Sequence, residues 1–170
     1  MPLSWLALIC LALPPNGLHV RTSMPSACFV DTNVMLYLKD PREPQKQAIA
    51  RSWIAALSER DLIIISPQVM NEFAYNVLRK FPAIATAELT QFLLAMEPWC
   101  KAPLTAATCL EGLAIHGRYR YSFFDSTLIA AALAYGCDIL LSEDLADGQK
   151  IGNLTIINPF ETALEAVLAS

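Results

Sequence analysis

The fold class is decided by the stretch Leu62-Ile63-Ile64-Ile65-Ser66-Pro67. Its four aliphatic residues form a continuous, mostly β-branched run that is too short for a helix, so they predict a buried strand. Ser66 and Pro67 then provide an N-cap and a proline at the first helical position, which predicts a helix that runs to about Lys80. A strand that leads directly into a helix is the repeating unit of parallel α/β sheets.

The same alternation of short apolar runs and longer helical segments continues through the chain. Strands are expected at residues 27–30, 62–65, 139–141 and 154–157, with a weak extended segment at 99–102. Helices are expected at residues 33–38, 44–58, 67–80, 83–96, 105–116, 122–135 and 160–168, and Gly117 and Gly136 are expected to end two of them. The alternation predicts an α/β fold, a three-layer sandwich with a mostly parallel central sheet flanked by helices.

Composition narrows the classes of protein to which this chain can belong. The 170 residues are 55 % hydrophobic and 16 % charged. That is enough apolar surface for a full core in one domain, and it excludes a disordered chain. With 12 basic and 16 acidic side chains the net charge is −4, so the chain is no general polycation. A site for nucleic acid would therefore be local, or bridged by a metal ion.

The cysteines and histidines exclude several kinds of site. The cysteines are scattered and odd in number, with no C-x-x-C pair: Cys10, Cys28, Cys100, Cys109 and Cys137. This pattern predicts buried thiols in a reducing compartment rather than a disulfide framework or a zinc site. His19 and His116 are the only histidines, which excludes a histidine-rich metal centre.

The first 24 residues differ in character from the rest. The apolar run at residues 5–13 covers less than half of the roughly 20 residues that a membrane-spanning helix needs. No Lys or Arg precedes it and no A-x-A-like site follows it, so an upstream extension, with Met24 as the working start, is favoured over a secretory signal. We therefore expect the protein in the cytoplasm. We expect residues 1–24 to be an apolar extension outside the fold, residues 25–170 to form one domain, and no stable membrane association.

Four acidic residues, far apart in the sequence, are expected at one edge of the sheet. Asp31 and Asp144 each come just after a predicted strand, while Glu72 and Asp125 lie in the second and first turns of predicted helices. Ligands of open parallel sheets gather at the carboxyl ends of the strands. Helices packed antiparallel to the strands begin at that same edge, so the four carboxylates can meet in one pocket.

Three of these acids also have a local structural explanation. Asp125 follows Ser122 by three residues, which is the spacing of a capping box. Asp31 can cap the helix that follows it, and Asp144 can shape a turn. Glu72 is too deep in its helix to cap it, and it borders an apolar stripe, where carboxylates rarely stay unpaired.

Carboxylates that share a pocket repel one another, and a hard divalent cation relieves this repulsion. Mg²⁺ and Mn²⁺ prefer carboxylate oxygen and retain bound water. Such a site can hold a phosphodiester, activate a water molecule and stabilise the charge on the leaving oxygen.

Four motifs, in their order along the chain, resemble those of PIN domains. They are Val30-Asp31-Thr32-Asn33, Asn71-Glu72-Phe73, Phe124-Asp125-Ser126 with Ala130-Ala131-Ala132, and Ser142-Glu143-Asp144. The resemblance covers about residues 28–159. It implies a metal-dependent ribonuclease, and the compact single-domain bacterial forms of this family are typically VapC-like toxins of type II toxin–antitoxin pairs.

The resemblance also implies the roles of individual residues. Mg²⁺ or Mn²⁺ would be held by Asp31, Glu72, Asp125 and Asp144, and a metal-bound water would cleave single-stranded RNA. Accessory roles would fall to Asn33, Ser142 and Asp147. Asp147 is either an outer carboxylate or a stabiliser of its turn, and Glu143 is expected to point away from the site if the strand alternation continues. The expected partners are RNA, a cognate antitoxin and a second copy of the chain.

Arginines alternate with tyrosines at residues 118–121. Arg118 and Arg120 are candidates for contacts with RNA, and a solvated loop is the alternative. Arg79 and Lys80 end a predicted helix, and we assign them to favourable interaction with its dipole rather than to RNA. The high apolar fraction predicts a hydrophobic surface that meets another subunit or an antitoxin.

Other classes of protein share part of this pattern. A dehalogenase-like phosphatase needs a second Asp two residues after the first, where this chain has Asn33. A receiver-like domain needs a late lysine at a strand end, whereas Lys150 lies in a loop-like stretch. The alternative that stays open is a catalytically silent PIN-like module that binds RNA or protein; loss of one acid would be its expected mark, and all four are present.

Overall fold

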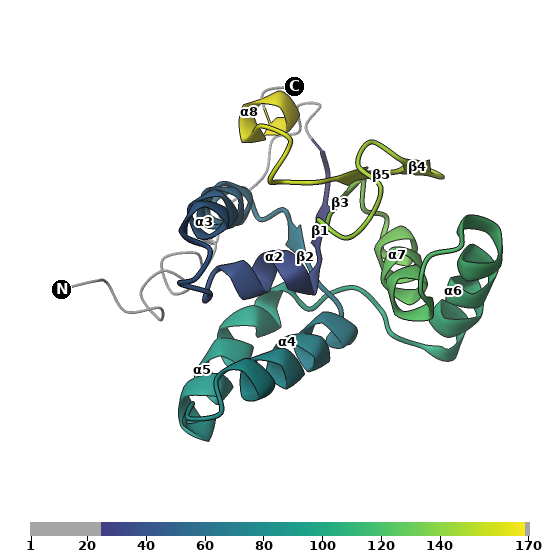
Figure 1. Ribbon diagram of the computed structural model, residues 1–170. Coiled ribbons are helices and arrows are strands. Elements are labelled where there is room, and N and C mark those ends of the chain that lie inside the picture. Colours follow the sequence, from purple (N-terminus) through teal and green to yellow (C-terminus); the bar gives the residue numbers. More distant parts are fainter. Residues whose placement is uncertain (1–24, 169–170) are drawn as a thin grey trace.

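Four parallel strands form the centre of the computed structural model, which describes residues 25–168 (Figure 1). The parallel strands are β1 (Cys28–Val30), β2 (Ile63–Ile64), β3 (Ile139–Leu141) and β5 (Leu154–Ile157). At one edge β4 (Lys150–Ile151) pairs antiparallel with β5, and the order across the sheet is β2-β1-β3-β5-β4. The predicted α/β fold with a mostly parallel sheet is confirmed.

Helices cover the sheet on both sides. They are α2 (Thr32–Tyr37), α3 (Pro44–Ser58), α4 (Pro67–Lys80), α5 (Thr86–Met96), the 3₁₀ turn η1 (Glu97–Trp99), α6 (Ala106–Tyr119), α7 (Phe123–Tyr135) and α8 (Leu164–Leu168). Figure 1 shows α3 on one side of the central strands and the α6–α7 pair on the other, with α2, α4 and α5 grouped below them. Every residue of β1 and β3 is buried, which explains why these strands are continuous apolar runs rather than alternating ones.

The strand order reverses at β1, and this places the site. The chain adds β2 on one side of β1 and later adds β3 on the other side, in register with Cys28 opposite both Ile63 and Ile139. The pairing continues one residue beyond β1, where the Asp31 N–H donates to the Leu141 carbonyl at 3.0 Å. The segments that follow β1 and β3 therefore begin side by side, at the switch point where open α/β sheets bind ligands.

The end of α6 differs from the prediction. Gly117 lies inside the helix, which continues to Tyr119 and ends at Arg120, a residue in the left-handed region with φ 66°. A helix tolerates an internal glycine at a small cost, so Gly117 did not have to end it. The chain turns where His116 Nδ1 meets the Tyr121 carbonyl at 2.6 Å. By contrast Gly136, with φ 92°, ends α7 as predicted.

Other boundaries also differ from the predictions. Lys150 belongs to β4 rather than to a loop, because the chain turns back there to pair with β5. The segment expected to be extended at 99–102 starts in η1, and its one strand-like contact is a bridge between Cys100 and Ile65. The helices α5 and α8 begin at Thr86 and Leu164, three and four residues later than predicted.

The expected N-terminal extension, residues 1–24, lies outside the described residues. Within residues 25–168, no helix has both the length and the apolar character needed to cross a membrane.

Two glycines of α6 are predicted to respond oppositely to alanine. A Cβ at Gly112 would lie 2.6 Å from Thr127 Cγ2 and 2.9 Å from the Thr127 Cα, so Gly112→Ala forces α6 away from α7. We expect a loss of about 1–3 kcal/mol in the free energy of unfolding, measured by urea denaturation. A Cβ at Gly117 meets nothing within 4 Å, so Gly117→Ala should gain up to about 1 kcal/mol. Equal stabilities for the two variants would contradict the close approach of the helices.

Candidate active site

Asp31 is the most deeply buried acid at the switch point, with 7 % of its surface exposed. Its Oδ1 accepts from the Thr32 N–H at 2.5 Å, and its Oδ2 accepts from Ser142 Oγ at 2.7 Å and Asn33 Nδ2 at 3.0 Å. Burial raises the pKa of Asp31 to about 7, and the nearby charges of Glu72 and Asp125 add to that rise. The hydrogen bonds from Ser142 and Thr32 oppose it, because they favour the ionised form.

Asn33 connects two of the acids. Its Nδ2 donates to Asp31 Oδ2, to Asp144 Oδ2 at 2.9 Å and to Ser142 Oγ at 3.2 Å. The Oδ1 of the same amide is buried and has no hydrogen-bond partner among the described residues. Asn33 and Ser142, expected to be accessory residues, thus lie between the carboxylates that follow β1 and β3.

Glu72 reaches the site from the second turn of α4. Thr32 Oγ1 donates to Glu72 Oε2 at 3.0 Å, and Gln68 Nε2 donates to Glu72 Oε1 at 2.9 Å. Gln68 also donates to the Phe124 carbonyl at 2.9 Å, which links α4 to the start of α7 beside Asp125. Sequence reasoning missed Gln68; its position one turn before Glu72 on the same helix was the available signal.

The local structural explanations for Asp125 and Asp144 hold as well. Ser122 Oγ accepts from the Asp125 N–H at 3.1 Å, which caps α7, and donates to Asp125 Oδ2 at 2.7 Å in place of the return bond of a capping box. The Asp144 N–H donates to Ser142 Oγ at 3.2 Å and closes a turn after β3. The bond from Ser122 also sets the direction of the Asp125 carboxylate, whereas the Asp144 carboxylate is held by Asn33 Nδ2.

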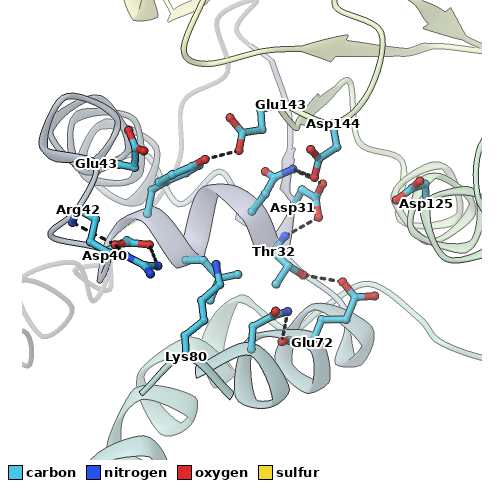
Figure 2. Close-up of a pocket in the computed structure, with 14 residues that line it drawn as sticks. Asp31, Thr32, Asp40, Arg42, Glu43, Glu72, Lys80, Asp125, Glu143 and Asp144 are labelled. Carbon is cyan, nitrogen blue, oxygen red and sulfur yellow. Dashed lines mark hydrogen bonds and ion pairs between the residues drawn. The ribbon is translucent and has the colours of Figure 1, made fainter. Parts of the chain in front are cut away.

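The four acids line one cavity of about 590 Å³ (Figure 2). Its wall is formed by Asp31, Thr32, Asn33, Leu36, Tyr37, Asp40, Arg42, Glu43, Glu72, Asn76, Lys80, Asp125, Glu143 and Asp144. As the side chains stand, no three His, Cys, Asp or Glu side chains within residues 25–168 are spaced to hold a metal ion. The donors nevertheless suit a hard divalent cation, because they are carboxylate oxygens with a surplus of negative charge and the unpartnered Asn33 oxygen beside them.

Glu143 also lines this cavity, and the prediction that it points away is wrong. Tyr37 Oη donates to Glu143 Oε1 at 2.5 Å, and Lys46 Nζ pairs with Glu143 Oε2 at 2.5 Å. The strand ends at Leu141, so the alternation of side chains does not extend to residue 143. Lys46 compensates the charge of Glu143. The hydrogen bond from Lys46 to Glu143 raises the pKa of the Lys46 ammonium group.

Three residues considered for the site lie elsewhere. Asp147 Oδ1 accepts from the Asn158 N–H at 2.7 Å, which is the turn-stabilising alternative for this residue. Arg118 and Arg120 are not in the wall of the cavity. The Arg118 guanidinium lies 5.2 Å from the centre of the Tyr119 ring at the end of α6, and both arginines are exposed.

A comparison with protein families matches the PIN domain to residues 28–146. The chain belongs to the PIN-domain family. The match begins at β1 and ends beyond β3, so it includes Asp31, Glu72, Asp125 and Asp144. PIN domains are generally nucleases that depend on divalent metal ions. None of the curated proteins compared with this PIN domain matches it.

At the end of the cavity away from Asp125, Asp40 forms a forked pair with Arg42. Arg42 Nε donates to Asp40 Oδ1 at 2.7 Å and Nη2 donates to Oδ2 at 2.5 Å. These hydrogen bonds hold the pKa of Asp40 at about 2, with smaller help from the charge of Lys80. Both residues lie in the loop between α2 and α3, so the pair holds the shape of this loop.

The pair predicts a pH-dependent contribution to stability. The pKa of Asp40 is lower in the folded than in the unfolded state, so its contribution is present above about pH 4 and is lost as the pH falls towards 2. Asp40→Asn should lower the free energy of unfolding at pH 7 by up to about 1 kcal/mol, since Arg42 is exposed to solvent. The difference between wild type and variant, measured by urea denaturation, should shrink between pH 4 and pH 2. A difference that stays constant over this range would argue against the ion pair.

Proposed function

We propose that this PIN domain is a metal-dependent endoribonuclease that hydrolyses phosphodiester bonds of single-stranded RNA. The observation that carries the proposal is the meeting of four carboxylates from four separate segments in one cavity at the switch point of the sheet. Asn33 bonds to two of them, and Asp31 is desolvated with a raised pKa. Carboxylates that gather in one cavity, one of them buried, call for a cation.

In this proposal Mg²⁺ or Mn²⁺ would be held by Asp31, Glu72, Asp125 and Asp144. When bound, the ion supplies an activated water and stabilises the charge on the leaving oxygen. The protein's own contribution is to hold the carboxylates in position. Asn33 joins Asp31 to Asp144, Gln68 and Thr32 orient Glu72, and Ser122 orients Asp125.

We further propose that the enzyme is the toxin of a type II toxin–antitoxin pair, acting on RNA in the cytoplasm. Its four motifs resemble those of PIN domains, whose compact single-domain bacterial forms are typically VapC-like toxins, and this resemblance supports the role. Exposed apolar side chains support a protein partner, either the antitoxin or a second copy: Leu110 and Leu113 on α6 are 70 % and 56 % exposed, and Phe124 on α7 is 66 % exposed.

Three of the four acids give the direct test of the nuclease. Asp31→Asn, Glu72→Gln and Asp125→Asn should each reduce cleavage of a single-stranded RNA panel at least about 100-fold in Mg²⁺ or Mn²⁺, because each removes an anionic ligand of the ion. Chelation with EDTA should have the same effect on the wild type. Cleavage is followed by gel electrophoresis of end-labelled RNA.

Glu111→Gln is the matched control for Glu72→Gln. Both glutamates lie within helices, but Glu111 is exposed on α6 and is not in the wall of the cavity. The Glu111→Gln variant should therefore cleave RNA at the wild-type rate. Equal cleavage by the wild type and all acid variants would exclude the proposed mechanism, and RNA binding without any cleavage would favour the catalytically silent module.

Asn33 is predicted to act through the acids that it joins. Asn33→Ala should weaken the apparent affinity for Mn²⁺ about 10- to 100-fold, with a smaller effect on the rate at saturating metal. The affinity is measured by titrating Mn²⁺ against the rate of cleavage, and independently by the shift in Tm on adding Mn²⁺. Asn71→Ala, on the exposed surface of α4, is the control. An unchanged Mn²⁺ titration for Asn33→Ala would show that Asn33 does not support metal binding.

A further inference from the structure

One face of α4 runs along the whole cavity. Glu72, Asn76 and Lys80 are spaced by four residues, and all three are in its wall. Eight residues of helix at 1.5 Å per residue separate Lys80 from Glu72 by about 12 Å along the axis. Figure 2 shows Lys80 with Asp40 and Arg42 on one side of the cavity, and Asp125 and Asp144 on the other. The cavity therefore has an acidic end and an end that carries cations.

Lys80 makes no hydrogen bond or ion pair within the part of the chain that the structure describes, although it lines the cavity. Three other lysines are each held by a carboxylate: Lys39 by Glu88, Lys46 by Glu143 and Lys101 by Asp61. The charge of Lys80 interacts with that of Asp40 at longer range, but both oxygens of the Asp40 carboxylate already accept hydrogen bonds from Arg42. The N–H groups of the Lys80 ammonium are thus available to donate to a ligand in the cavity.

The surroundings of Lys80 suit an anion better than the acidic end does. Asp40 is neutralised by Arg42, whose side chain is 65 % exposed at the rim. Lys80 and Glu43 are the other charged residues at this end, so its two cations and two acids balance. At the other end four carboxylates meet with no basic residue in the wall beside them.

We infer that Lys80 binds a backbone phosphate of the RNA at a distance from the phosphodiester that is cut. This inference rests on the proposed ribonuclease function. A span of about 12 Å is longer than the spacing of neighbouring phosphates on one strand, so the anchored phosphate belongs to a flanking nucleotide. The substrate would lie along α4, with the scissile bond at Asp31, Glu72 and their neighbours and a second phosphate on Lys80. Contacts of this kind set affinity and register without reading sequence.

The competing explanation is the helix dipole. Lys80 and Arg79 both lie in the last turn of α4, where a positive charge stabilises the helix. Arg79 differs in its contacts: its Nη2 donates to Asn76 Oδ1 at 3.2 Å, its guanidinium lies 6.0 Å from the centre of the Tyr75 ring, and it is not in the wall of the cavity. Arg79 is therefore the matched control for Lys80.

The test compares Lys80→Gln, Lys80→Arg and Arg79→Gln on a single-stranded RNA octamer. Lys80→Gln should raise KM roughly three- to tenfold with little change in kcat, and Lys80→Arg should restore it. The slope of log(kcat/KM) against log[salt] should become shallower by about 0.7 in Lys80→Gln, the value for one phosphate contact on a single strand. Arg79→Gln should leave KM and the salt slope unchanged. If Lys80 instead acts only on the helix dipole, as Arg79 does, Lys80→Gln and Arg79→Gln should both lower the Tm.

Substrate length separates this inference from the proposed function. A dinucleotide that reaches the acids is too short to reach Lys80, so wild type and Lys80→Gln should cleave it with the same kcat/KM. Octamer cleavage with no change in KM or salt slope on losing Lys80 would overturn the inference and leave the nuclease intact. If the wild type cleaves nothing, the proposed nuclease function is wrong. Binding of a labelled octamer, followed by fluorescence anisotropy, then tests Lys80: the salt slope of binding should be shallower in Lys80→Gln by the same amount. No binding at all would overturn both.

Discussion

The burial of the Asp31 carboxyl group is the constraint on which the rest of this site depends. A carboxylate with so little exposed surface is costly unless hydrogen-bond donors surround it. Its donors come from three places: the first N–H of α2, the Asn33 amide and the Ser142 hydroxyl beyond β3. To supply them, the chain must bring the ends of β1 and β3 together and start α2 at once. The bonds that make burial tolerable are the same ones that build the wall of the cavity.

Structural and functional explanations of the acids are compatible in this fold. Ser122 caps α7 through the backbone of Asp125 and also donates to its carboxylate, and Ser142 closes the turn that carries Asp144. A side chain held by a local bond loses little further freedom when a ligand binds. A capping motif at such a position is therefore weak evidence against a role in the site, because capping is one way to aim a carboxylate.

Charge is distributed unevenly along the cavity. Glu143 and Asp40 are each neutralised by a basic partner, Lys46 and Arg42 respectively. Within residues 25–168 the acids at the switch point have polar donors but no basic partner, and a bound cation would balance their charge. In a chain with net charge −4, a polyanion would depend on that cation and on a few local basic residues.

The sequence by itself determined the βα units, the parallel sheet and the order of the acid-bearing motifs. Runs such as residues 62–65 bury both faces and are too short for helices, and Asp31 or Asp144 can be placed from the strand ends alone. Tertiary structure decided which side chains meet. Glu143 turns inward because β3 ends before the alternation reaches it, and Gln68 bridges α4 to α7 across more than fifty residues of sequence. Lys80 faces the cavity because α4 packs beside α2 with its Glu72 face inward. The charges and helical propensities of the sequence do not specify how these two helices pack.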